Sequence, residues 1–120
     1  MEFDVFTLAL LVTGPVPERP PAGEPDPLQD AHLAHQARLR VSGELLAAGP
    51  CTFSDRPEVR GMVLFTVDGP RAKALLDADP SIAAGRFQAE LATWWVPEQV
   101  VVSGTGALPS SLAEVRGDVP

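Results

Sequence analysis

Two histidines and one aspartate fall on apolar faces of predicted helices, where ionisable side chains are not expected. The apolar face of the first helix holds four residues within about 60° of one another: Leu28, His32, His35 and Leu39. Asp79 falls on the apolar face of a second helix, directly before Pro80. Ionisable groups are costly to bury unless they are paired. We therefore predict a His–carboxylate pair between His32 and Asp79.

Such a pair has a chemical use. A carboxylate that accepts one imidazole N–H fixes the tautomer and increases the basicity of the other nitrogen. His32, oriented by Asp79, is then suited to take a proton from a carbon acid or a hydroxyl. The alternative is a buried structural hydrogen bond that joins the two helices. An open cavity at His32 would favour chemistry, and a sealed pair would favour structure.

His35 lies one turn further along the same face. It either lines the same cavity as a ligand-binding residue or packs in the core with its nitrogens satisfied. A metal site made of His32, His35 and Asp79 is a weak alternative, since structural zinc requires a fourth ligand. We expect no metal and no cofactor.

The remaining candidates are one tryptophan, the single cysteine and several arginines. Trp94 and Trp95 alternate in direction at the end of a predicted strand, and Trp94 is the candidate wall for a ring-bearing ligand. The alternative for both is the core of the sheet and of a dimer. Cys51 is interpreted as a small hydrophobe. Three arginines have the charge to orient an anionic ligand, although a solvated surface is their default interpretation: Arg38, Arg60 and Arg86.

Composition limits the class of protein. A chain of 120 residues is one domain by size. Its formal charge of −7 argues against a nucleic-acid partner, which requires clustered Lys and Arg. The N-terminus is acidic where a signal peptide is basic, and the apolar run at residues 5–12 is too short to span a bilayer. We expect a cytoplasmic protein without membrane contact.

The chain reads as strand, helix, strand, strand, helix, strand. The strands are predicted at residues 3–12, 44–53, 61–67 and 87–96. Asp26 and Pro27 begin the first helix and Gly43 ends it, while Asp68 begins the second. Residues 14–25 hold five prolines and are expected to form an exposed loop. The tail is expected to hold a short strand at residues 100–103, followed by about a dozen residues without structure.

This order is typical of an α+β fold of the ferredoxin-like βαββαβ type. It predicts an antiparallel sheet with both helices on one face. The other face would expose Phe, Leu and Trp side chains. Pairing two such sheets in a homodimer would cover them.

The sequence also resembles the YCII-related family. The resemblance rests on DAHLAHQARLRVSGELLAAGP at residues 30–50 and on RGMVLFTVDGPRAKALLDADPSIAAGRFQAELATWW at residues 60–95. It implies a dimeric α+β barrel, similar in fold to muconolactone-isomerase-type proteins, within residues 1–97. Residues 98–120 would then be a partly disordered C-terminal extension. The resemblance places the family's catalytic histidine at His32 and its acid at Asp79.

These observations lead to two functional hypotheses. The first is a small cofactor-independent enzyme, a lyase or isomerase, that uses the His32–Asp79 pair for proton transfer on a small cyclic or aromatic metabolite. The second is a non-catalytic dimeric module that binds a small ligand or acts as an accessory protein. In the second hypothesis the His–Asp pair is structural.

Overall fold

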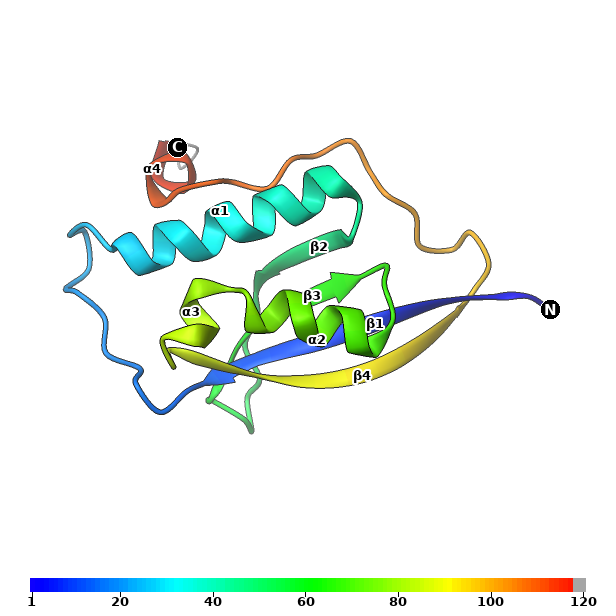
Figure 1. The fold of residues 1–120 in the computed structure, drawn as a ribbon, viewed down its shortest axis with the longest axis horizontal. Coiled ribbons are helices and arrows are strands. Elements are labelled where there is room, and N and C mark those ends of the chain that lie inside the picture. Colours follow the sequence, from blue (N-terminus) through cyan, green and yellow to red (C-terminus); the bar gives the residue numbers. More distant parts are fainter. Residues whose placement is uncertain (118–120) are drawn as a thin grey trace.

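The computed structural model of the chain describes residues 1–117. It is an α+β structure built on one four-stranded antiparallel sheet with the strand order β2-β3-β1-β4. The strands are β1 (Phe3–Thr13), β2 (Leu45–Pro50), β3 (Val59–Phe65) and β4 (Phe87–Pro97). The helices are α1 (Pro27–Ser42), α2 (Gly69–Asp77), α3 (Pro80–Ala83) and α4 (Leu112–Gly117). Helices α1, α2 and α3 lie over the same face of the sheet (Figure 1).

Strand β1 is central because its apolar run is paired along both edges. It pairs with β4 from Phe3 to Thr13 and with β3 from Thr7 to Val12. Alternate side chains point to opposite faces, so Ala9 and Leu11 join the helix-covered core while Leu8 points to the open face. The predicted buried strand is therefore present.

Local signals define α1. The Asp26 side chain accepts the backbone N–H of Gln29, and Pro27 occupies the first turn, where its missing N–H costs no hydrogen bond. Gly43 ends the helix with φ of 83°, in the left-handed region that glycine adopts without a steric penalty. Both ends therefore form as the sequence predicts.

Helices α2 and α3 are separated by a two-residue corner. Asp68 caps α2, as predicted, and Ala78 ends it. Asp79 has φ of −69° and ψ of 122°, an extended conformation that is common before proline, and it caps the four-residue helix α3. The predicted position of this acid, just past the end of the second helix, is therefore correct.

The core lies between the helices and one face of the sheet. Its members come from both layers, so the helices and the sheet share a single apolar cluster. They are Ala9, Leu11, Leu39, Leu45, Val63, Phe65, Ala72, Leu75, Leu76 and Phe87.

The loop at residues 14–25 is attached to the sheet where it begins. Gly14 N–H donates to the Arg86 carbonyl at 2.8 Å, and Val16 N–H donates to the Gly85 carbonyl at 2.9 Å. A Cβ on residue 14 would overlap the Gly85 carbonyl, so this close approach requires glycine.

The C-terminal stretch differs from the sequence prediction. No strand is present at residues 100–103, and α4 lies within the segment for which no structure was expected. Figure 1 shows this segment returning along α1. Residues 118–120, also expected to lack structure, are outside the described residues. The domain boundary at residue 97 stays a prediction.

Within residues 1–117, no helix is both long and apolar enough to cross a membrane.

Candidate functional site

His32 and Asp79 meet between α1 and the corner that follows α2. The His32 Nδ1 atom lies 2.6 Å from Asp79 Oδ2, and the two residues are 5% and 2% exposed. Forty-seven positions separate them in sequence. The structure therefore brings together the two side chains that the sequence predicted would meet.

Ser81 completes this buried group. Its backbone N–H and its hydroxyl both donate to Asp79 Oδ1, at 2.9 and 2.8 Å, and its Oγ lies 3.1 Å from His32 Nδ1. Both carboxylate oxygens of Asp79 are thus occupied, one by Ser81 and one by His32. Sequence reasoning did not single out Ser81, although a serine two residues after a capping aspartate is a recognisable signal.

The Asp79 carboxyl stays acidic despite its burial. Burial by itself raises the pKa of Asp79, but the hydrogen bonds from His32 and Ser81 outweigh it and hold this pKa below the ordinary value. A charged carboxylate at this position accepts a proton-bearing Nδ1. His32 is therefore the Nδ1–H tautomer when it is neutral.

This tautomer leaves the second nitrogen of His32 available. Within residues 1–117, His32 Nε2 has no hydrogen-bond partner. His32 lines a cavity of about 490 Å³, and the Phe87 ring lies 5.6 Å from its imidazole, centroid to centroid. A cavity of this size is typical of a small-ligand site. The arrangement can accept a proton from a bound molecule.

The cavity wall comes from distant parts of the chain. The apolar part is made by β1, α1, the start of β4 and the C-terminal segment, through Leu11, Leu33, Phe87, Leu108, Leu112 and Val115. The polar part includes Gln29, whose Oε1 is buried without a partner in residues 1–117.

The C-terminal wall is held by specific contacts. The Arg40 guanidinium donates to Ser103 Oγ at 2.6 Å and to the carbonyls of Gly104 and Gly106 at 2.8 and 2.9 Å. Leu112 N–H donates to Asp30 Oδ1 at 2.8 Å. Residues 103–112 are therefore attached to α1, and Leu108 and Leu112 of this segment line the cavity.

His35 has a different environment from His32. Its Nε2 lies 2.8 Å from the Leu75 carbonyl, so Nε2–H donates and joins α1 to α2. It is 8% exposed and does not line the cavity beside His32. The interpretation of His35 as a packed, satisfied histidine fits this geometry better than a ligand-binding role.

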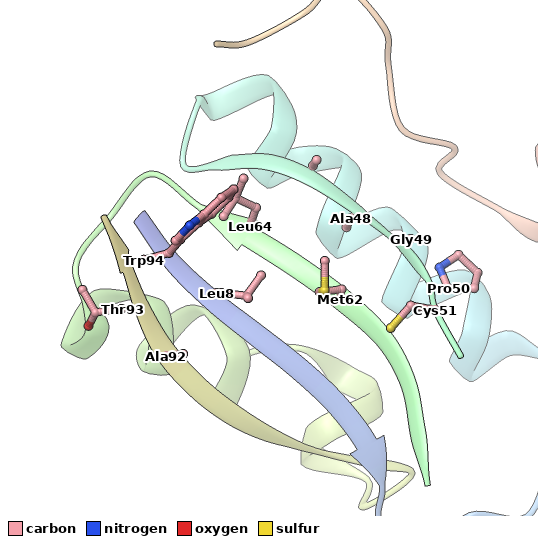
Figure 2. A pocket seen from close by; sticks show the side chains of 11 residues that line it. Leu8, Ala48, Gly49, Pro50, Cys51, Met62, Leu64, Ala92, Thr93 and Trp94 are labelled. Atoms are coloured by element: carbon pink, nitrogen blue, oxygen red, sulfur yellow. The ribbon is translucent and has the colours of Figure 1, made fainter. Parts of the chain in front are cut away.

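Trp94 lies on the opposite face of the sheet from His32. It is 42% exposed and lines a separate cavity of about 600 Å³ on the open face, whereas Trp95 does not line it. Figure 2 shows Trp94, Leu8 and Met62 projecting from that face, with the helices behind the sheet. The aromatic residue next to His32 is Phe87, which the sequence analysis did not select.

Arg86 is buried, which differs from the default interpretation of a solvated surface. It is 5% exposed, and its Nη1 donates to both carboxylate oxygens of Asp26 at 3.0 and 2.8 Å. Its Nη2 donates to the Glu18 carbonyl at 3.2 Å. This ion pair fixes the start of α1 and the loop at residues 14–25 against β4.

Among residues 1–117, no group of three or more His, Cys, Asp or Glu side chains is arranged to hold a metal ion. His32 and His35 face different partners, so their spacing does not create a shared ligand set.

No protein-family model matches the chain, and no curated protein sequence matches it.

Proposed function

We propose that this protein is a small enzyme of the YCII-related type that transfers a proton on a small cyclic or aromatic molecule. His32 is the base and acid, and Asp79 orients it. One observation carries the proposal: His32 Nδ1 is held 2.6 Å from Asp79 Oδ2, while Nε2 is unpartnered within residues 1–117 and the residue lines a cavity of about 490 Å³.

The proton moves in a defined direction. His32 Nε2 takes a proton from a carbon or hydroxyl of the bound molecule, and Asp79 stabilises the imidazolium that forms. In an isomerisation the same nitrogen returns the proton to a different carbon as the double bond moves. In an elimination the carbon's electron pair forms a double bond and the leaving group departs with its own pair.

The fold supports this proposal. The element order and the strand order β2-β3-β1-β4 fit a ferredoxin-like βαββαβ domain. We further propose a homodimer of the α+β barrel type, in which the open faces of two sheets pack together. Met62 and Trp94 on that face are 41% and 42% exposed, and a dimer would cover them.

Deuterium exchange tests the proposed reaction across a range of candidate substrates. A panel of cyclic ketones and unsaturated lactones, each with and without a carboxylate group, is incubated with the protein in D2O, and exchange of their C–H protons is followed by NMR. We expect wild type to accelerate exchange for at least one compound. His32→Asn keeps a donor for Asp79 but removes the base, so its rate should fall about 10²-fold or more.

His35→Gln is the matched control, since a glutamine Nε2 can still donate to the Leu75 carbonyl. It should exchange at nearly the wild-type rate. Equal rates in wild type and His32→Asn, or no exchange above the buffer rate across the panel, would contradict the proposed function. Those results would favour a binding module with a structural His–Asp pair.

A further inference from the structure

Two arginines border the His32 cavity from separate elements. Arg19 comes from the loop at residues 14–25, and its guanidinium carbon lies 5.3 Å from the centroid of the Phe87 ring. Arg60 comes from β3. Both line the cavity that contains His32, and both also line an adjoining cavity of about 200 Å³ with Phe87 and Arg86. Positive charge is thus concentrated at one end of the site.

Within residues 1–117, no carboxylate forms an ion pair with Arg19 or Arg60. Arg38, Arg40 and Arg116 also pair with no carboxylate in this range, but none of them lines the cavity. Other arginines do have partners: Arg56 pairs with Glu58 and Glu90, and Arg71 pairs with Glu44.

The charge of the Asp26 carboxylate acts on Arg19, but this carboxylate forms its ion pair with Arg86. Both carboxylate oxygens of Asp26 accept hydrogen bonds from Arg86 Nη1. Partial burial and the nearby charges of Arg86 and Arg60 lower the pKa of Arg19. Arg19 and Arg60 are both exposed, so their guanidinium groups are accessible to an anion that enters the cavity they line.

We propose that Arg19 and Arg60 bind the acid group of the molecule on which His32 acts. The substrate would be a small anionic compound, a carboxylate or a phosphate, whose apolar body lies against Phe87. Guanidinium groups donate paired N–H bonds to both kinds of anion. This proposal rests on the proposed function, because it identifies the bound anion as the reacting molecule. The binding of an anion can nevertheless be measured without turnover.

Three probes separate charge from shape. Benzoate and benzamide have nearly the same size, but only benzoate is charged, and phenyl phosphate carries the alternative anion. Binding is measured by isothermal titration calorimetry at low salt, with the full chain. We expect benzoate or phenyl phosphate to bind at least about tenfold more tightly than benzamide. The tighter of these two anions identifies the acid group.

Variants locate the binding site. Arg19→Gln and Arg60→Gln should each lower the affinity for the tighter-binding anion about tenfold. The double variant should bind that anion no more tightly than it binds benzamide. Arg38→Gln is the matched control, because Arg38 is an exposed arginine of α1 that does not line the cavity. It should bind the anion as wild type does.

Two results would overturn this assignment. The first is benzamide binding as tightly as both anions, or no saturable binding of any probe. The second is anion binding that Arg19→Gln and Arg60→Gln leave unchanged.

His32→Asn separates this proposal from the proposed function. It should still bind the anion within about threefold of wild type, because the charge contacts are intact. If the anion binds His32→Asn normally but wild type exchanges deuterium on no compound, the anion site is supported and the catalytic role of His32 is contradicted. If deuterium exchange depends on His32 while the arginine variants bind the anion normally, the catalytic role is supported and the anion site is contradicted.

Discussion

The two nitrogens of His32 have separate tasks because their surroundings differ. Nδ1 is committed to Asp79, which is itself held by the backbone and hydroxyl of Ser81. Nε2 has no partner within residues 1–117, and the residue lines the cavity. Ser81 fixes the orientation of the Asp79 carboxylate, and Asp79 fixes the orientation of the His32 ring. The imidazole is therefore oriented before any ligand binds. Pre-organisation of this kind is what proton transfer requires.

Acidic pH should lower the free energy of unfolding by protonating Asp79. Its pKa in the folded state lies below the ordinary value of 3.8, so the charged carboxylate contributes stability above that value. This contribution is lost as the pH falls through the lower folded-state pKa. Asp79→Asn should therefore cost about 1–3 kcal/mol near neutral pH, and less in acid. Urea unfolding between about pH 7 and pH 2 measures both free energies.

Asp55→Asn serves as the control for this experiment, since Asp55 is an exposed residue. It should follow the wild-type stability at every pH. A difference between wild type and Asp79→Asn that stays constant down to about pH 2 would show that the charge of Asp79 does not stabilise the fold.

At the scale of elements, the site depends on how α1 is anchored. Its first turn is capped by Asp26, and the same carboxylate pairs with Arg86, the residue directly before β4. One residue therefore sets the beginning of the helix and fixes it to the sheet. His32 lies less than two turns further along, so its position follows from this contact.

Breaking the Asp26–Arg86 pair should be costly. Arg86→Gln leaves the Asp26 carboxylate buried beside a neutral group, and we expect a loss of about 3–5 kcal/mol in the free energy of unfolding. Adding Asp26→Asn removes the unpaired charge and retains a capping oxygen, so the double variant should recover part of the loss. Chemical denaturation checks this. A single variant within about 1 kcal/mol of wild type would disprove the role of the pair.

Local sequence patterns predicted the ends of α1 and the position of Asp79, but they did not predict contacts between residues far apart in the sequence. Asp26, Pro27 and Gly43 define α1 through interactions within a few residues, and such signals can be recognised in a sequence. Asp79 was predictable because an apolar stripe and a following proline placed it. The partner of Arg86 was not predictable, because Asp26 lies 60 positions away and many exposed acids are equally available.

The cavity itself could not be predicted. Its wall combines Arg19 from a proline-rich loop and Leu112 from the C-terminal helix with residues of the sheet. Neither segment has the periodicity that identifies a core element. Their positions depend on single contacts, such as the Leu112 N–H bond to Asp30. Trp94 was the more conspicuous aromatic residue, yet Phe87 is the one beside His32.

At the scale of the whole molecule, the two faces of the sheet have different roles. One face carries the core and the His32 site. The open face carries Leu8, Met62, Leu64 and Trp94 around a shallow apolar cavity (Figure 2). Apolar surface that remains exposed in one chain is a recurrent sign of association.

The proposed homodimer gives opposite expectations for two adjacent tryptophans. Trp94→Asp places a charge on the open face and should convert the dimer to a monomer in analytical ultracentrifugation at micromolar concentration. Trp95→Asp, on the other face, is the matched control and should remain a dimer. A wild-type monomer at that concentration, or equal effects of the two variants, would contradict the proposed interface.

The protonation state of the two imidazoles tests the orientation of His32 by Asp79 without any substrate. The chain has only two histidines, so ¹⁵N NMR resolves each of them without further labelling schemes. At a pH where both rings are neutral, we predict opposite tautomers: His32 with the proton on Nδ1 and His35 with the proton on Nε2. Adding benzoate should shift His32 Nε2 and leave His35 unchanged. A proton on His32 Nε2, or a His32 ring that does not respond to any cavity ligand, would contradict the proposed role of the His32–Asp79 pair.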